Sequence, residues 1–314
     1  MAWGTLILTI GVTATLMLPP AAFLAAQDKP IATFKSGVDL VRLNAVVRDR
    51  KGRFVRDLTV RDFEVLDGGV TRKIAEFRTD SGQISVALLF DVSGSMESRL
   101  PDARDAARHV LSWLDQPQDE AAVFTFDTRL SEVTPFTYGL KHLPGKLEAI
   151  TPFGATSLHD AIGETADRLA DRPGLRRAVI VFTDGNDNAS RRTPEQVSAA
   201  ASAIDVPVYV FAVVPNIDNP LAESRFVGSG PSPLSGALAD LAAWTGGHTF
   251  VASIPAERSA SAKQIVDELR HQYLIAFESS GRPGWHPLVV RARGKDLTVR
   301  ARSGYHAGQS RPIS

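Results

Sequence analysis

The sequence predicts an α/β fold, in which a doubly wound, mostly parallel sheet is combined with a small antiparallel β module built from both flanks. Two nearly continuous apolar runs, Ile84–Phe90 and Ala178–Phe182, are typical of parallel strands buried on both faces. Segments with helical spacing alternate with such runs in the middle of the chain. Hairpin patterns lie on either side of this middle part.

The first part of the β module is expected over residues 36–80. Val38 and Leu40 begin an alternation of apolar and polar side chains, and turns rich in Gly and Asp follow at Asp49–Gly52 and Asp67–Gly69. This pattern is typical of antiparallel hairpins. Since so short a segment has no convincing core of its own, we expect it to pair with the hairpins at the other end of the chain.

The α/β domain is expected over residues 81–255. Leu100, Ala103 and Ala107 repeat at helical spacing after the first buried strand. Further strands are expected near residues 121–126, 133–137 and 206–214, and further helices near residues 158–169, 194–204 and 234–244. This alternation of strands and helices favours a sheet that is covered by helices on both faces.

Residues 256–314 are expected to form a last helix near 262–270 and then hairpin strands near 272–277, 285–293 and 297–302. Arg291 and Arg293 share one face of a strand, and Arg300 and Arg302 share one face of the next, which is expected to pair with it. The simplest interpretation is a solvated outer face. The alternatives are a stripe facing an anion or a membrane, and a face resting against the central domain.

The composition excludes several classes of protein. The 314 residues include 35 basic and 35 acidic side chains, and a neutral chain is a poor candidate for a nucleic-acid binder. Within residues 81–255 there are 13 basic and 21 acidic side chains, so the middle is acidic and the flanks are basic. The 44% of hydrophobic residues argue against disorder, and the absence of cysteine excludes disulfides and thiolate metal sites.

Residues 1–26 are predicted to be a signal peptide or an N-terminal anchor. They carry no charged side chain and are mostly apolar, with Pro19-Pro20 and small residues before Gln27. We therefore expect an extracytoplasmic protein, periplasmic or secreted. If the segment is not cleaved, it is expected to hold the protein at the membrane.

Five oxygen-bearing residues form a candidate metal site. Asp91, Ser93 and Ser95 follow the first buried strand directly, and Asp184 follows the second one in the sequence Thr-Asp-Gly. Thr156 lies in a Gly-containing loop between them. Open α/β sheets place their ligands at the carboxyl ends of parallel strands, and Mg²⁺ prefers hard oxygen donors. A chance turn or helix cap is the alternative explanation of the Asp-x-Ser-x-Ser segment.

These residues closely resemble the metal-ion-dependent adhesion site of von Willebrand factor type A domains, with every position of that motif matched. The resemblance covers roughly Ile84–Ala252. It implies a Mg²⁺ or Mn²⁺ ion held by Asp91, Ser93, Ser95, Thr156 and Asp184, with the two serines as direct ligands. It also implies that a protein partner supplies an Asp or Glu to the ion. The flanks resemble, more loosely, exported bacterial proteins related to this family.

The leading functional hypothesis is an exported adhesion or scaffolding module without catalytic activity. A metal-dependent hydrolase is the first alternative, because Asp91 ends a buried strand as in enzymes with an aspartyl-phosphate intermediate. Those enzymes carry a motif that resembles Asp-x-Asp-x-Thr. In this chain Ser93 stands at the position of the second Asp, which usually acts as the general acid. The second alternative is a structural envelope protein in which the metal only stabilises the fold.

Three further features accompany the candidate site. His159 lies near Thr156 but is expected to pack or be solvated at a helix start, and Asp187 is expected to be a polar loop residue. The segment 215–233 is long and rich in Pro, Gly and Ser. We expect it to lie on the metal's face and shape the partner site, with Asp218 and Glu223 as candidate internal ligands.

Overall fold

The computed structural model describes Met1 and residues 40–79, 82–172, 174, 176–203, 205–213, 236–294 and 296–307. The predicted signal peptide beyond Met1 and the segment 215–233, with Asp218 and Glu223, lie outside the described residues. Contacts group the chain from Val38 onward into one compact unit. The predicted boundaries at residues 81 and 256 stay predictions. Among the described residues, no helix combines the length and apolarity needed to cross a membrane.

A six-stranded sheet forms the centre of this unit, in the order β10-β9-β8-β5-β6-β7. All neighbouring pairs are parallel except β6 and β7, which form the predicted hairpin. The central strands β5, β8 and β9 are almost completely buried, as their apolar sequences predict. The strands are β5 (Ile84–Asp91), β6 (Glu120–Phe126), β7 (Leu130–Tyr138), β8 (Arg176–Thr183), β9 (Val208–Val213) and β10 (Thr249–Ala252).

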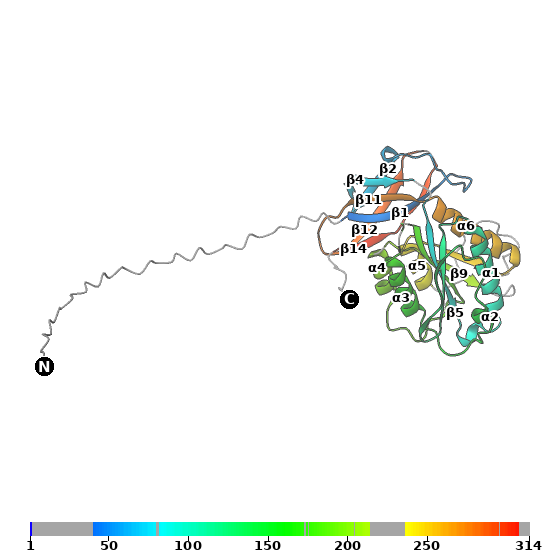
Figure 1. Cartoon of the computed structure of the whole chain (residues 1–314). Helices are drawn as coiled ribbons and strands as arrows, with labels where there is room; N and C mark the ends of the chain where they lie inside the picture. Colours follow the sequence, from blue (N-terminus) through cyan, green and yellow to red (C-terminus); the bar gives the residue numbers. More distant parts are fainter. Residues whose placement is uncertain are drawn as a thin grey trace, which may run out of the picture. The chain divides into compact units, whose positions relative to one another are not determined.

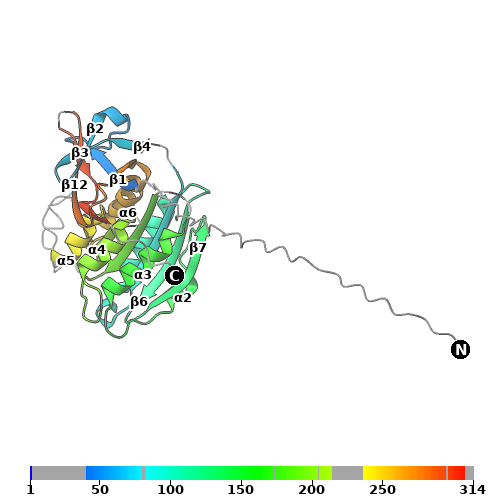
Figure 2. The same cartoon turned by 90° about the vertical axis from the view of Figure 1, so that its left-hand side faces the viewer.

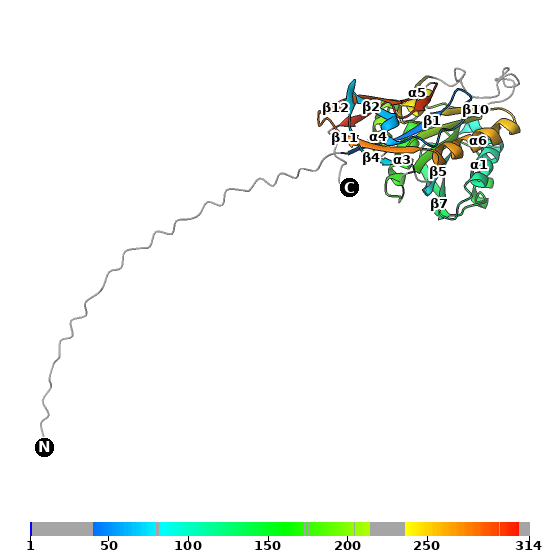
Figure 3. The ribbon, with the colours of Figure 1, turned by 90° about the horizontal axis from the view of Figure 1, so that it is seen from above.

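Helices cover both faces of this sheet, which confirms the doubly wound prediction. Figure 1 shows one layer with α1 and α6 and an opposite layer with α3, α4 and α5. In Figure 3, α6 lies beside α1. The helices are α1 (Leu100–Trp113), α2 (Gly145–Glu148), α3 (Leu158–Ala170), α4 (Pro194–Ala203), α5 (Gly236–Trp244) and α6 (Pro255–Arg270).

The two flanks of the chain build one antiparallel β module, as predicted. It contains two four-stranded sheets, β13-β1-β11-β4 and β14-β12-β2-β3, around a shared apolar core that includes Leu43, Val65 and Phe277. Figure 2 shows β1, β2, β3 and β12 close together. The strands are β1 (Leu40–Arg48), β2 (Phe63–Asp67), β3 (Val70–Arg72), β4 (Ile74–Arg78), β11 (Tyr273–Glu278), β12 (Gly284–Ala292), β13 (Thr298–Arg300) and β14 (Gly304–Ala307).

The predicted pairing of the two arginine-bearing strands is wrong. β12 pairs with β2 and β14, whereas β13 pairs with β1 in the other sheet. Arg291 and Arg293 are exposed, which fits the solvated face. Arg302 is buried and donates to the backbone oxygens of Ser202 and Arg42, so this strand end rests against the α/β layer instead.

A buried carboxylate joins the β module to α6. The Glu268 side chain is 1% exposed and accepts hydrogen bonds from Arg48 of β1, at 2.9 Å, and from Arg300 of β13. Burial alone would raise the pKa of Glu268, but the charges of Arg300 and Arg48 outweigh burial and hold this pKa below its usual range. The negative charge of Glu268 on α6 and the positive charges of Arg48 and Arg300 in the β module therefore form a contact in which the carboxylate is protected from solvent.

Candidate metal centre

Three loops meet at the carboxyl ends of β5 and β8. Because these strands pair in parallel with Phe90 opposite Phe182, the residues after them emerge at the same edge of the sheet. The loop after β5 and the loop before α3 are joined by two backbone hydrogen bonds, from Gly94 N to Gly154 O at 3.2 Å and from Phe153 N to Val92 O at 2.9 Å. Asp91 is the last residue of β5, and the other four predicted ligands lie on these three loops.

Asp91 lies at the bottom of the site and is fully buried. Its carboxylate accepts hydrogen bonds from Ser93 N at 2.9 Å and from Thr183 Oγ1 at 2.7 Å. Burial raises the pKa of Asp91 most, the hydrogen bonds from Ser93 and Thr183 lower it, and the negative charge of Asp184 raises it further. The two carboxylates therefore interact electrostatically, and a cation between them would favour the ionised form of Asp91.

The two serines begin a short 3-10 helix, Gly94–Met96. Ser93 is 1% exposed, and its Oγ lies 3.2 Å from the Oγ of the exposed Ser95. Met96 is fully buried in the core beneath them, so it anchors this turn to the sheet. The turn thus brings two neutral hydroxyl oxygens together next to Asp91.

Thr156 is held in place by the loop after β8. The residue is 2% exposed, and its N–H donates to Asn188 Oδ1 at 2.9 Å. Its carbonyl oxygen accepts hydrogen bonds from the N–H groups of Asn188 and Ala189, both at 3.1 Å. These three bonds use the backbone of Thr156, so its position is fixed without the side-chain hydroxyl. Sequence reasoning missed Asn188, whose only signal is its place in the polar loop after Asp184.

Asp184 already has a cationic neighbour. Its side chain is 2% exposed, and Oδ2 accepts a hydrogen bond from Arg99 Nη1 at 2.5 Å. Asn186 Nδ2 lies 3.3 Å from the other carboxylate oxygen. Arg99 precedes α1, and its side chain is 26% exposed. Sequence reasoning missed Arg99, because a lone arginine eight residues after Asp91 carries no recognisable signal.

The donor set fits a small divalent cation. Two carboxylates balance its charge and three hydroxyl groups add oxygen donors without adding charge, which suits Mg²⁺. Among the described residues, no group of three or more His, Cys, Asp or Glu side chains is arranged to hold a metal. The candidate centre therefore depends on hydroxyl donors, and its binding of an ion stays a prediction.

His159 and Asp187 contact each other at the start of α3. Asp187 Oδ2 accepts a hydrogen bond from His159 N at 2.9 Å and lies 2.7 Å from its Nδ1. Burial raises the pKa of Asp187, but the hydrogen bonds from Ser190 and His159 outweigh this and lower it overall. Asp187 thus ties the third loop to the beginning of α3, which agrees with the structural role expected for both residues.

The fold and this site define a doubly wound α/β domain with a polar centre at the carboxyl ends of neighbouring parallel strands. Residues 86–186 match the family model of the von Willebrand factor type A domain. This match and the mostly parallel six-stranded sheet show that the chain contains a domain of the von Willebrand factor A type. No curated protein matches the chain.

Several solved structures resemble the chain at low identity. The conserved hypothetical protein BatB from Bacteroides thetaiotaomicron is 20% identical, with a TM-score of 0.45 over 59% of this chain and 98% of that one. An aerotolerance-related membrane protein from Bacteroides fragilis is 18% identical, with the same score and coverage. A von Willebrand factor type A protein from Catenulispora acidiphila is 13% identical, with a TM-score of 0.47 over 87% of this chain and 76% of that one.

Proposed function

We propose that this chain is a divalent-cation-dependent protein-binding module that acts in adhesion or scaffolding. A domain of the von Willebrand factor A type suggests a role in protein interaction. The observation that carries the proposal is that the segments bearing the two carboxylates and the three hydroxyls are joined at one edge of the sheet. Asp91, Ser93, Ser95, Thr156 and Asp184 would hold Mg²⁺ or Mn²⁺. When bound, the ion would offer an open coordination position to a carboxylate of the partner.

The protein's own residues would provide the rest of the binding surface. Phe153 lies in the same loop as Thr156 and is 81% exposed, although it is a large apolar residue. Its backbone N–H is bonded to Val92 O at 2.9 Å, so the exposed ring is presented from a fixed loop. Exposed aromatic residues beside a polar centre are typical of interaction sites. An apolar group of the partner next to the carboxylate would cover this ring.

We infer that the protein binds and does not catalyse. The buried Asp91 carboxylate accepts hydrogen bonds from Ser93 and Thr183, and no carboxylate stands two positions after it to act as a general acid. The alternatives are a metal-dependent hydrolase and a structural protein whose ion only stabilises the fold. Hydrolysis of a generic phosphoester that is lost in Asp91→Ala would favour the hydrolase.

Metal binding is tested by calorimetry with Mg²⁺ and Mn²⁺ on the wild type and on Asp91→Ala. The matched control is Asp171→Ala, which removes an exposed carboxylate that has no ion pair among the described residues. We expect binding by the wild type and the control, and none by Asp91→Ala. Equal heats for all three proteins would falsify the metal assignment.

Partner binding is tested by capture from an envelope fraction in Mg²⁺ and in EDTA, with the bound proteins identified by mass spectrometry. We expect a defined protein that is captured only in Mg²⁺, by the wild type and the Asp171→Ala control but not by Asp184→Ala or Ser93→Ala. Metal binding without such capture, together with a lower melting temperature in EDTA, would instead support the purely structural role.

We also infer an extracytoplasmic location from the uncharged apolar start of the sequence. The test is a fusion of residues 1–40 to a phosphatase that is active only outside the cytoplasm. Activity of the fusion is expected. N-terminal sequencing of the mature protein then distinguishes cleavage before Gln27 from an uncleaved anchor.

A further inference from the structure

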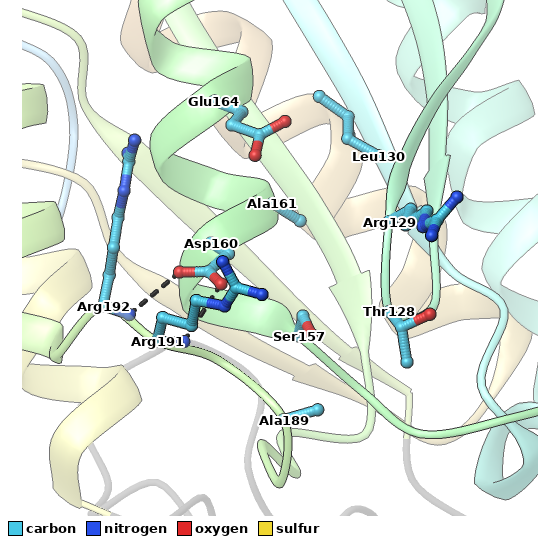
Figure 4. A pocket seen from close by; sticks show the side chains of 10 residues that line it. All are labelled: Thr128, Arg129, Leu130, Ser157, Asp160, Ala161, Glu164, Ala189, Arg191 and Arg192. Atoms are coloured by element: carbon cyan, nitrogen blue, oxygen red, sulfur yellow. Dashed lines mark hydrogen bonds between the residues drawn. The ribbon is translucent and has the colours of Figure 1, made fainter.

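A hollow of about 690 Å³ opens beside the candidate metal centre (Figure 4). It lies between the β6–β7 turn, the first turns of α3 and the segment before α4. Two of its lining residues, Ser157 and Ala189, belong to the loops that hold Thr156. Ser157 follows Thr156 directly, and Ala189 N donates to Thr156 O at 3.1 Å. The hollow and the candidate metal centre therefore share a wall.

The charge of the hollow is unusual for this part of the chain. Three arginines and two carboxylates line it, in a segment that otherwise has an acidic excess. In Figure 4, Arg129 comes from the β6–β7 turn on one side, and Arg191 and Arg192 come from the segment before α4 on the other. Each side of the hollow thus supplies a cation.

One carboxylate and one arginine of the hollow are already engaged. Asp160 accepts hydrogen bonds from the backbone N–H groups of Arg191, at 3.0 Å, and Arg192, at 2.9 Å, which fixes the loop before α4. The Arg192 guanidinium lies against Gly163, where an added Cβ would be 2.1 Å from Nη1, and this Nη1 is 3.9 Å from Asp167. Arg192 is therefore positioned along α3.

Arg129 and Arg191 are the other two arginines that line the hollow. Both are exposed, and among the described residues neither has a carboxylate within 4.0 Å of its guanidinium group. The backbone of Arg129 is nevertheless fixed, because its N–H donates to Asp127 Oδ1 at 2.9 Å. Glu164, the second acidic residue of the hollow, is exposed on α3 and does not balance both arginines. Two arginines with fixed backbones and without a carboxylate partner among the described residues thus line a space large enough for a side chain.

We propose that this hollow binds a second acidic side chain of the same protein partner whose first carboxylate binds at the cation. The inference rests on the proposed function and adds the chemistry of the partner, which is an acidic segment with two carboxylates at a set spacing. Arginine suits this role because its planar donors match a carboxylate in a bidentate arrangement. The second contact would give the metal site a selectivity that one carboxylate cannot supply.

The test uses labelled hexapeptides of Gly and Ser that carry either one Asp or two Asp residues at spacings of one to four. Binding is measured by fluorescence polarisation in Mg²⁺ and in EDTA. The proteins are the wild type, Arg129→Gln/Arg191→Gln, and the matched control Arg56→Gln/Arg61→Gln, which removes from the β module two exposed arginines that have no ion pair within the described part of the chain. Circular dichroism checks that all three are folded.

For the wild type and the control, we expect one spacing to bind about fivefold more tightly than the single-Asp peptide. In Arg129→Gln/Arg191→Gln, this advantage should disappear while binding of the single-Asp peptide stays the same. Binding that needs Mg²⁺ but shows no advantage of a second Asp, or an advantage that survives the double substitution, overturns the inference alone. Failure of every peptide to bind in a Mg²⁺-dependent way overturns the proposed function and the inference together.

Discussion

Replacing Arg99 by Gln should strengthen Mg²⁺ binding at the candidate centre. Arg99 Nη1 lies 2.5 Å from Asp184 Oδ2 and so occupies a carboxylate that the cation needs. Before the ion can use this oxygen, the guanidinium has to give up the hydrogen bond. Glutamine keeps much of the side chain's length but carries no charge, so it leaves the carboxylate available.

The expected gain in Mg²⁺ affinity follows from the strength of the hydrogen bond between Arg99 and Asp184. A hydrogen bond between charged groups contributes about 1.5–3 kcal/mol. Asp184 is almost completely buried, but the Arg99 side chain is 26% exposed, and water screens the pair in part. The lower part of the range, about 1.5–2 kcal/mol, therefore applies. It corresponds to a roughly ten- to thirtyfold lower Kd for Mg²⁺ in Arg99→Gln.

Calorimetric titration with Mg²⁺ measures this difference directly. Arg129→Gln is the matched control, because it removes the same charge from a nearby turn without touching a carboxylate of the site. A similar gain in both variants would mean that only the general electrostatic field had changed. Weaker binding by Arg99→Gln would refute the reasoning, since Arg99 would then orient Asp184 for the ion instead of competing with it.

Three further predictions concern stability. Glu268→Gln should lower the unfolding free energy by about 3 kcal/mol at neutral pH in urea denaturation, because it leaves two arginines without their buried partner. Since the pKa of Glu268 is lowered on folding, its contribution is present above pH ~4.5 and lost as the pH falls through the folded-state pKa; thermal melts of the wild type and variant should therefore converge in acid. Gly247→Ala should destabilise the fold by about 2–3 kcal/mol, because the new Cβ would lie 1.9 Å from Val208 O, whereas Gly145→Ala, with nothing within 4 Å, should leave the melting temperature unchanged.

Local sequence patterns were enough to predict the α/β layer. The nearly continuous apolar run of β5 predicted a strand buried on both faces, and the alternation of strands and helices predicted the two helix layers. The candidate site followed from the same logic. Asp91 is the last residue of β5 and Asp184 directly follows β8, and parallel strands bring their carboxyl ends to one edge.

Contacts between distant parts of the chain could not be predicted in this way. Alternation in the flanks identified strands but not partners, so β12 and β13 were wrongly paired with each other although they belong to different sheets. A solvated face was the simplest interpretation for Arg302, and the alternative of a face against the central domain could not be preferred, because nothing in the neighbouring sequence shows that the backbone of Ser202 will accept its hydrogen bond. Arg99 escaped attention for the same reason, since only the folded chain brings it to Asp184.

The position of β1 has a consequence for the order in which the protein folds. β1 lies between β11 and β13, so the strand made first in the described chain has partners that are made nearly last. Contacts this distant in sequence close slowly, and an unpaired strand offers its backbone groups to other chains in the meantime. The β module should therefore be the last part to assemble and the part where aggregation begins when refolding is slow.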